Sequence, residues 1–343
     1  MDWNTYKERF IYKAKRANKN DEYIKKNLSY AQKLYKKNIP IIYDITHLSL
    51  LVGVNLDYIM SVAYSPNSFY RTFQIKKYNG NKRTISEPLP LLKDIQKWIL
   101  TEILEQIEVS KFAKAYISNV SLKENARFHK NKKIVLKLDI KNFFGSFQKV
   151  DVFKLFKELG YSKDVATTLT NLCVLKGSLP QGASTSPYLS NILMKSFDTA
   201  VSKYCINRKI MYTRYADDMT FSGEFNISKL IKFIRSELKT RSMELNEKKT
   251  RTMYPHQRQE VTGITVNKKM QISKSKKNNI RLEVYYIEKL GINNHIKNIS
   301  STLSPEMYLK SLLGKVEYGL FINPDDNQLK AFKKSIKRTL KEF

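Results

Sequence analysis

The stretch YTRYADDMTFSG, residues 212–223, places two adjacent carboxylates, Asp217 and Asp218, inside a run of aromatic and β-prone residues. The residues on both sides of the pair are typical of strands, so the stretch predicts a strand, a tight turn and a second strand. Because Asp is common in turns, a solvated turn is the simplest interpretation of the pair taken alone. A functional interpretation requires further carboxylates elsewhere in the chain.

A lone carboxylate stands in a second apolar strand. The stretch IVLKLDI, residues 134–140, carries Asp139 among apolar neighbours. A buried aspartate without a partner is costly, and Mg²⁺ compensates for it because this hard cation takes carboxylate oxygens and retains sites for water and substrate phosphates. Two such ions held by Asp139 and Asp217 would stabilise the attacking and leaving oxygens of an in-line phosphoryl displacement.

Charge and composition limit the class of protein. The 343 residues include 62 Lys and Arg against 31 Asp and Glu, which gives a net charge of +31. Such an excess, spread along the chain, indicates a polyanion partner, most often nucleic acid; a lysine-rich solvated surface is the alternative. Hydrophobic residues make up 42% and aromatic residues 12%, which excludes a disordered chain.

The chain gives no sign of a membrane span, a secretory signal or a cysteine-based metal site. No apolar run approaches the roughly 20 residues that cross a bilayer, and the N-terminus is charged throughout. We therefore expect a cytoplasmic protein without membrane contact. Cys173 and Cys205 stand in unrelated contexts, so we expect both to be reduced and buried.

Hydrophobic periodicity predicts a mixture of helices and short strands. The first forty or so residues interleave Tyr and Lys at helical spacing, which indicates one or two basic amphipathic helices. Residues 72–88, TFQIKKYNGNKRTISEP, predict a hairpin around an Asn-Gly turn. Core-facing helices are predicted over residues 91–107 and 186–205, and after residues 227–250 the chain turns helical again and ends in a basic region that carries Tyr and Lys.

Three motifs together resemble the reverse transcriptases. Tyr215-Ala216-Asp217-Asp218 resembles their Y-x-D-D catalytic hairpin, and LDIKNFF, residues 138–144, resembles their first catalytic strand. LPQGASTSPYLSN, residues 179–191, resembles the segment that packs beside the incoming nucleotide and primer. The motifs occur in the family's order, and the resemblance runs from about residue 46 to about residue 270.

Two further stretches resemble the extra regions of bacterial retron reverse transcriptases. ENARFH, residues 124–129, contains the pattern N-A-x-x-H, and EVTGITVN, residues 260–267, contains V-T-G. Taken alone, His129 also fits an ordinary satisfied histidine, and V-T-G fits a strand with a bend. The retron resemblance implies that both regions bind RNA, through Asn125, Ala126, His129, Val261, Thr262 and Gly263.

The resemblance implies an α+β right-hand polymerase fold with fingers, a ferredoxin-like palm of antiparallel sheet plus helices, and a helical thumb. A basic helical N-terminal extension would span residues 1–45, and the fingers 46–133. The palm would span residues 134–272, with interleaved fingers helices at about 149–180, and the thumb 273–343.

The resemblance also implies roles for single residues. Asp139, Asp217 and Asp218 would bind two Mg²⁺ ions, with Asp139 and Asp217 as direct ligands. Lys249, in the pattern N-x-x-K-T of LNEKKT, would donate a proton to the leaving pyrophosphate; a solvated lysine is the alternative. The implied nucleotide-binding residues are Lys77 and Arg83 on the triphosphate, Phe144 under the sugar C2′, with Phe143 as a core aromatic, and Gln181 and Gly182 beside the nucleotide.

The family implies partners beyond the deoxynucleotides. These are a cognate structured non-coding RNA, its DNA product joined through a 2′-5′ linkage to a guanosine, and an accessory effector protein in antiphage defence. The alternatives are another bacterial reverse transcriptase, such as an intron maturase or a defence polymerase without a retron RNA, a catalytically dead RNA-binding module, and a scaffold for an effector. Intact Asp139, Asp217 and Asp218 disfavour the dead module.

Overall fold

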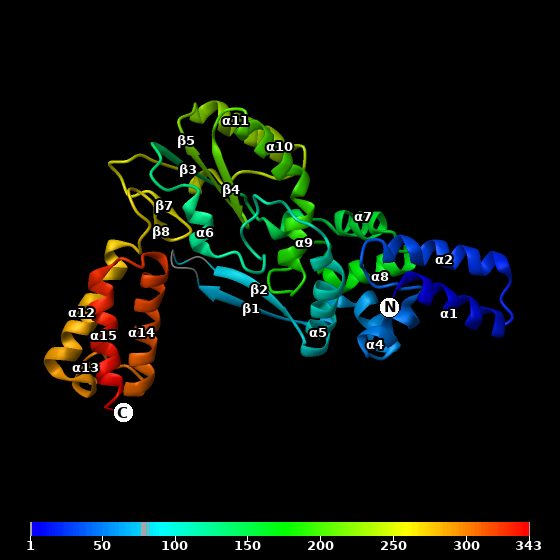
Figure 1. Cartoon of the computed structure of the whole chain (residues 1–343), viewed down its shortest axis with the longest axis horizontal. Helices are drawn as coiled ribbons and strands as arrows, with labels where there is room; N and C mark the ends of the chain where they lie inside the picture. Colours follow the sequence, from blue (N-terminus) through cyan, green and yellow to red (C-terminus); the bar gives the residue numbers. More distant parts are fainter. Residues whose placement is uncertain (1, 77–79, 81, 343) are drawn as a thin grey trace. The chain divides into compact units, whose positions relative to one another are not determined.

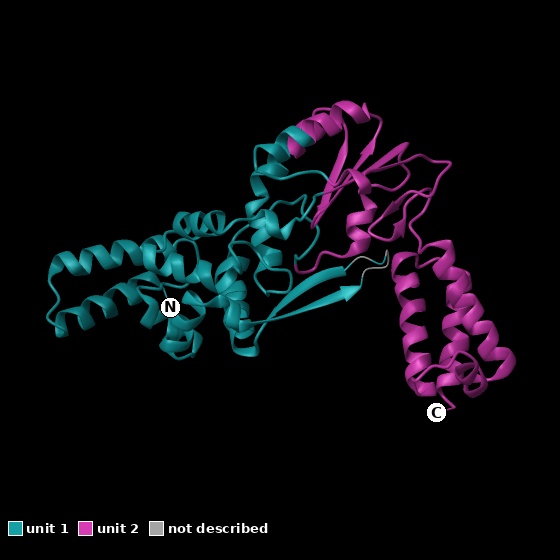
Figure 2. Ribbon diagram, turned by 180° about the vertical axis from the view of Figure 1, so that it is seen from behind, with its two compact units in different colours: residues 1–117, 140–200, 235–245 teal, residues 118–139, 201–234, 246–343 magenta. Residues whose placement is uncertain are grey.

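A computed structural model describes residues 2–76, 80 and 82–342 as helices joined to short antiparallel strands (Figure 1). The chain divides into two compact units, each assembled from segments that are distant in the sequence (Figure 2). Unit 1 consists of residues 1–117, 140–200 and 235–245, and unit 2 of residues 118–139, 201–234 and 246–343. The predicted division into extension, fingers, palm and thumb stays a prediction.

Unit 2 contains a four-stranded antiparallel sheet. Its strands are β4 (Met211–Tyr215), β5 (Asp218–Gly223), β3 (Ile134–Asp139) and β6 (Arg251–Met253), in that order across the sheet. Since side chains alternate along a strand, one face carries the apolar pairs of β3 and β5. Leu136 lies opposite Phe221 and Leu138 opposite Met219, and all four side chains are fully buried.

The other face of this sheet continues into the helical part of unit 2. Val135 of β3 and Met253 of β6 belong to one apolar core with Val261, Ile264 and buried residues from five helices. The remaining elements of unit 2 are α6 (Leu122–Arg127), η5 (Glu247–Lys249), β7 (Glu260–Val261), β8 (Ile264–Thr265), α12 (Lys274–Leu290), α13 (Ile292–Asn298), α14 (Pro305–Ile322) and α15 (Asn327–Leu340).

Unit 1 is mainly helical and contains one hairpin of strands. In that hairpin, β1 (Tyr70–Lys76) pairs with β2 (Lys82–Pro88) in antiparallel register. The helical elements are α1 (Trp3–Arg16), α2 (Asp21–Tyr35), α3 (Ile45–Val52), α4 (Leu56–Tyr64), η1 (Pro66–Phe69), α5 (Pro90–Trp98), η2 (Ile99–Ile103), η3 (Leu104–Gln106), η4 (Phe144–Ser146), α7 (Lys149–Leu159), α8 (Lys163–Cys173) and α9 (Ser186–Leu193). Helices α10 (Lys195–Ile206) and α11 (Ile227–Lys239) contribute residues to both units.

The basic N-terminal helices are anchored to the corner between α7 and α8. The ammonium group of Lys37 donates to the carbonyl oxygens of Glu158 at 2.7 Å and Leu159 at 3.0 Å, at the C-terminal end of α7. The buried Tyr161 donates its hydroxyl to the carbonyl oxygen of Pro40 at 3.0 Å. Because a helix C-terminus carries partial negative charge, the Lys37 contact is electrostatically favourable. The helices expected from the Tyr and Lys spacing are therefore present and packed.

Most secondary-structure predictions are confirmed, with two local differences. The hairpin over residues 72–88 is present. The helix predicted over residues 91–107 is α-helical only to Trp98 and continues as one π-helical and one 3₁₀ segment. The helix predicted over residues 186–205 divides at Met194 into α9 and α10, although the Met194 N–H still donates to the Ser190 carbonyl.

Two further findings concern the apolar segments and the cysteines. Within the described part of the chain, no single helix has the length and apolar character to cross a membrane; only α3 and α4, bent by 113°, reach that composition as a pair. Cys173 and Cys205 are both free and buried, as predicted. Burial raises the pKa of each thiol to about 12, so neither is a reactive thiolate at neutral pH.

Candidate active site

Three carboxylates meet at one edge of the unit 2 sheet. Asp139 is the last residue of β3, and it lies directly opposite Asp218, the first residue of β5. Ala216 and Asp217 form the two-residue turn that joins β4 to β5, so Asp217 lies directly before Asp218. Asp139 is only 3% exposed. Directly opposed residues in antiparallel strands have Cβ atoms about 4.5–5.5 Å apart, so the sheet places carboxylates from distant segments side by side.

Asp139 is held on both of its oxygens. Asn246 donates its side-chain amide to one oxygen at 2.9 Å, and the Lys249 ammonium lies 2.6 Å from the other. The Asn246 backbone N–H also donates to the Asp139 carbonyl oxygen at 2.8 Å. The prediction for the N-x-x-K-T pattern named Lys249 but missed Asn246, although Asn246 is the first residue of that pattern.

The carboxylates perturb one another electrostatically. Burial, together with the negative charges of Asp139 and Asp218, raises the pKa of Asp217 to about 6. Burial also raises the pKa of Asp218, against the opposing effect of Lys137. Burial alone would lower the pKa of Lys249, but its hydrogen bond to Asp139 and the three negative charges raise it. The site therefore concentrates negative charge that a cation would stabilise.

A cationic cavity of about 350 Å³ adjoins Asp218. Lys137 of β3 contributes to its wall, and the Lys137 ammonium lies 3.7 Å from an Asp218 oxygen. Lys248, Lys249 and Arg251 contribute from η5 and β6. Sequence reasoning missed Lys137, although the two-residue period of a strand places it on the same face as Asp139.

The two phenylalanines after Asp139 have different environments in unit 1. Phe143 is 4% exposed and packs edge-to-face on Phe147, with ring centroids 5.1 Å apart. Phe144 is half-buried, and its ring centroid lies 6.4 Å from that of Tyr116. The prediction that Phe143 is a core aromatic is confirmed. The sugar-reading role of Phe144 stays a prediction.

The backbone at Gly182 packs closely against strand β2 of unit 1. The Gln181 carbonyl accepts from the Ser86 N–H of β2 at 2.8 Å, and Gly182 has φ of +127°. A Cβ atom added at Gly182 would lie 2.6 Å from the Ser86 carbonyl oxygen. Glycine is therefore required for backbone packing against β2. Arg83 is exposed on β2, whereas Lys77 lies outside the described residues.

The two stretches with the retron patterns pack against each other in unit 2. Asn125 of α6 donates its amide to the Thr262 hydroxyl at 3.4 Å. Thr262 and Gly263 form the two-residue turn between β7 and β8, with φ of +45° and +82°. Positive φ at both turn positions is typical of a tight hairpin and explains the glycine. Asn125, Ala126 and Val261 are buried, and their predicted role in RNA binding stays a prediction.

His129 is a satisfied core histidine in this structure, and its role in RNA binding stays a prediction. Its ring is fully buried, with one nitrogen 2.8 Å from the Ser222 hydroxyl and the other 2.8 Å from the Thr213 hydroxyl. Burial, with a smaller effect of Lys132, lowers its pKa to about 3. The neutral ring therefore links α6 to strands β4 and β5. Among the predicted RNA-binding residues, Thr262 and Gly263 remain partly exposed.

Residues 75–279 match the family described as reverse transcriptase (RNA-dependent DNA polymerase). The Retron Ec86 reverse transcriptase of Escherichia coli is 30% identical over 278 residues, which cover 79% of this chain and 86% of that protein. The chain belongs to the retron reverse transcriptases. The predicted α+β polymerase fold and RNA-directed DNA polymerase activity follow from this membership.

Two further matches show how much of each similar protein this chain covers. The Retron Ec83 reverse transcriptase of Escherichia coli is 31% identical over 252 residues, covering 67% of this chain and 79% of that protein. A solved structure of telomerase from Candida albicans covers 79% of this chain and 63% of its own, with a TM-score of 0.47 and 13% identity. The chain thus spans most of the length of the Ec86 and Ec83 reverse transcriptases but under two thirds of the telomerase chain.

Retron reverse transcriptases, like other reverse transcriptases, require a metal ion, and the donor set of this site fits one. Within residues 2–76, 80 and 82–342, no group of three or more His, Cys, Asp and Glu side chains is arranged to hold an ion. Mg²⁺ usually binds one or two carboxylates together with substrate phosphates and water. Asp139 and Asp217, whose charges repel, would supply hard oxygen donors of the kind that this coordination uses.

Replacement of His129 by Gln should make stability less dependent on pH. The folded pKa of about 3 lies below the unfolded value, which is about 6.5. The stabilisation by the neutral ring is therefore complete above pH 6.5 and declines as the pH falls toward 3. We expect the parent protein to lose about 1 kcal/mol more than the variant between pH 7.5 and 5.5 in urea unfolding. Equal losses would show that His129 does not titrate in this way.

Replacement of Gly182 by Ala should destabilise unit 1 more than replacement of Gly177. Both glycines have positive φ, but a Cβ atom at Gly177 has no neighbour within 4 Å. The two variants therefore share the backbone strain of roughly 1–3 kcal/mol and differ in the collision with β2. Urea unfolding of both variants measures the difference. If the Gly177 variant loses as much stability, contact with Ser86 is not the constraint.

Proposed function

We propose that this protein copies a cognate structured RNA into DNA, starting from a 2′-hydroxyl of a guanosine in that RNA. The product is a branched RNA–DNA molecule, and the protein acts in the cytoplasm in antiphage defence, together with an effector protein. Membership of the retron reverse transcriptases supports the proposal, because the relatives that cover most of the chain carry that description. The proposal includes deoxynucleotides and the RNA as partners.

One observation carries the catalytic part of the proposal. Asp139 and Asp218 are register partners on neighbouring strands, and Asp217 occupies the turn beside them. We assign Asp139 and Asp217 as direct ligands of two Mg²⁺ ions and Asp218 as a secondary ligand. When bound, the ions activate the attacking hydroxyl and stabilise charge on the leaving group.

The protein's own residues orient these ligands and supply a proton. Asn246 fixes the side chain of Asp139 and leaves its second oxygen to Lys249. Because its pKa is raised, Lys249 stays protonated at neutral pH, which is the form that a proton donor to pyrophosphate needs. We assign Lys77 and Arg83 to the triphosphate, Phe144 to the sugar, and Gln181 and Gly182 to the nucleotide, on the motif resemblance.

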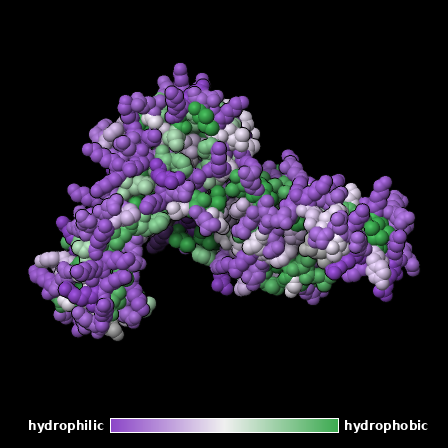
Figure 3. Space-filling view, in the orientation of Figure 1, coloured by the Kyte–Doolittle hydropathy of each residue, from purple (hydrophilic) through white to green (hydrophobic). Residues whose placement is uncertain are grey.

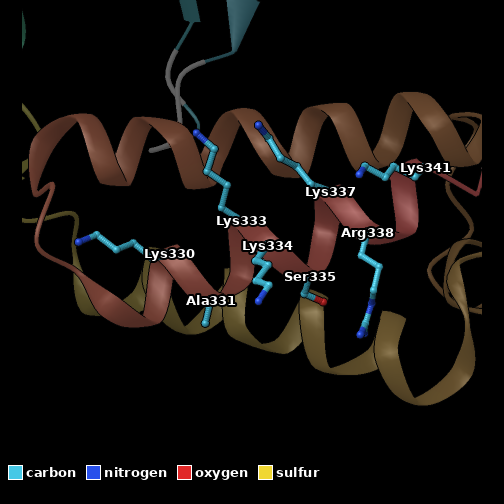
Figure 4. Close-up of a pocket in the computed structure, with 8 residues that line it drawn as sticks. All are labelled: Lys330, Ala331, Lys333, Lys334, Ser335, Lys337, Arg338 and Lys341. Atoms are coloured by element: carbon cyan, nitrogen blue, oxygen red, sulfur yellow. The ribbon is translucent and has the colours of Figure 1, made fainter.

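The helical end of unit 2 offers a surface for the RNA. Hydrophilic residues dominate the face of α12 to α15 that is visible in Figure 3. Six cationic side chains project from successive turns at the end of the chain and line one surface pocket (Figure 4); they are Lys330, Lys333, Lys334, Lys337, Arg338 and Lys341. Helix α15 contains no acidic residue, so its face attracts phosphates along its length.

Asp217→Asn should abolish DNA synthesis and leave RNA binding intact. The change removes a proposed metal ligand but leaves the basic surface unchanged, so the two functions should separate. Since metal catalysis supplies several kcal/mol, synthesis should fall at least ~100-fold. Primer extension with Mg²⁺ measures synthesis, and filter binding measures the affinity for RNA.

The matched control is Asp325→Asn, which neutralises an exposed aspartate of unit 2. This variant should synthesise DNA like the parent protein. Near-parental synthesis by Asp217→Asn would refute the metal-ligand assignment. Sequencing of co-purified nucleic acid then tests the retron part, because a covalent RNA–DNA hybrid is expected and unlinked DNA would indicate another defence reverse transcriptase.

Phe144→Ala should admit ribonucleotides. A ring beneath the sugar excludes the 2′-hydroxyl, so its removal should lower the ratio of deoxynucleotide to ribonucleotide efficiency. The measurement is kcat/KM for both nucleotides, with melting temperature as a check on folding. Phe143→Ala serves as the control, since this buried ring should cost roughly 3–5 kcal/mol of stability and reduce both efficiencies alike. An unchanged ratio in a folded Phe144 variant would exclude it as the sugar gate.

A further inference from the structure

Arg214, two residues before the turn that carries Asp217, has no exposed surface. It is the largest fully buried side chain in the described part of the chain. On β4 it lies opposite Met219 of β5, which in turn lies opposite Leu138 of β3, and both of these neighbours are fully buried. A guanidinium stays charged and is costly to bury beside apolar residues. Burial of the group therefore requires partners for its donors, and the turn supplies one of them.

The guanidinium of Arg214 is bonded to the turn of the catalytic hairpin. One terminal nitrogen donates to the carbonyl oxygen of Ala216 at 3.1 Å. Ala216 is 6% exposed and has φ of +58°, a left-handed conformation. This conformation costs an L-residue roughly 1–2 kcal/mol, and glycine is the usual residue at the first position of such a turn.

The carbonyl of Ala216 belongs to the peptide that joins Ala216 to Asp217. In two-residue turns, rotation of this central peptide changes the sign of φ at the second residue. Of the two turn residues, Ala216 has positive φ and Asp217 does not. A donor fixed on the Ala216 carbonyl therefore selects one orientation of the central peptide, and with it the direction of the Asp217 side chain.

We propose that Arg214 is a positioning residue for Asp217, which it controls by holding the central peptide of the turn from the buried side of the sheet. Asn246 has the corresponding role for Asp139, so each proposed metal ligand has its own support. The inference rests on the proposed role of Asp217 as a metal ligand. Residues that orient metal ligands commonly contribute about 10- to 100-fold to metal affinity or activity.

The test measures metal binding without turnover. Binding of Mn²⁺ is followed by electron paramagnetic resonance on protein with a chain-terminated primer–template and the next deoxynucleotide. Arg214→Met should weaken Mn²⁺ binding at least ~10-fold and raise the half-saturating Mg²⁺ concentration in primer extension to a similar extent. RNA affinity should stay at the parental level, because the guanidinium is fully buried.

The matched control is Phe221→Leu. Phe221 is also fully buried, lies on the same face of the sheet and stacks on Tyr212 with ring centroids 5.0 Å apart, but it is five residues from Ala216 on the following strand. This variant should lose stability and keep parental Mn²⁺ affinity. An equal loss of metal affinity in both variants would overturn the proposal, since it would reflect general loosening of the sheet.

A second substitution covers the case in which Arg214→Met does not fold. Arg214→Lys keeps the positive charge but replaces the planar guanidinium with a compact ammonium group. A folded Lys variant should therefore bind Mn²⁺ with an affinity between those of the parent protein and the Met variant. Parental affinity in a folded Met or Lys variant would overturn the proposal. Asp217→Asn distinguishes this failure from that of the proposed function, because unchanged Mn²⁺ binding in that variant would refute the metal-ligand assignment itself.

Discussion

The antiparallel pairing of β3 with β5 is the constraint on which the site depends. Its register sets Asp139 opposite Asp218 and, two steps away, Lys137 opposite Thr220. The intervening pair, Leu138 and Met219, is fully buried on the opposite face. A slip of one residue would exchange the two faces, moving the carboxylate toward the apolar side and the leucine toward the site. The apolar face thus determines where the acids lie.

That pairing brings three carboxylates together, and the surrounding residues offset part of their mutual repulsion. Burial, followed by the negative charges of Asp139 and Asp218, raises the pKa of Asp217 to about 6. The Lys249 ammonium offsets the charge of Asp139, and the Asn246 amide orients its carboxylate. The Lys137 ammonium lies near the carboxylate of Asp218. An active centre commonly retains such unfavourable repulsion because its function requires it, and the rest of the fold supplies the compensating stability.

The remaining retron patterns have a structural explanation in this fold. His129 joins α6 to the strands of the catalytic hairpin through two hydroxyl groups, and Asn125 joins α6 to the β7–β8 turn. These hydrogen bonds between distant segments restrict which residue types fit at the buried positions. Thr262 and Gly263 are partly exposed, whereas Asn125, Ala126, His129 and Val261 are buried.

The sequence by itself determined the features that depend on a short run of residues or on several motifs in a fixed order. Alternation around Asn-Gly predicted β1 and β2, and the order of three motifs predicted the fold and the approach of Asp139 to the hairpin that carries Asp217. Contacts between distant segments could not be read in this way, because burial and pairing arise only when the chain has folded. Only the tertiary structure shows that His129 is buried in the core and that Gly182 packs against Ser86. Likewise, only the structure shows that Asn246 bonds Asp139 and that Arg214 bonds the peptide before Asp217. The partners of His129, Gly182 and Asn246 lie 84 to 107 residues away, and no local pattern encodes which of these atoms will meet. Arg214 bonds a residue only two positions away, but the sequence does not show that its side chain is buried.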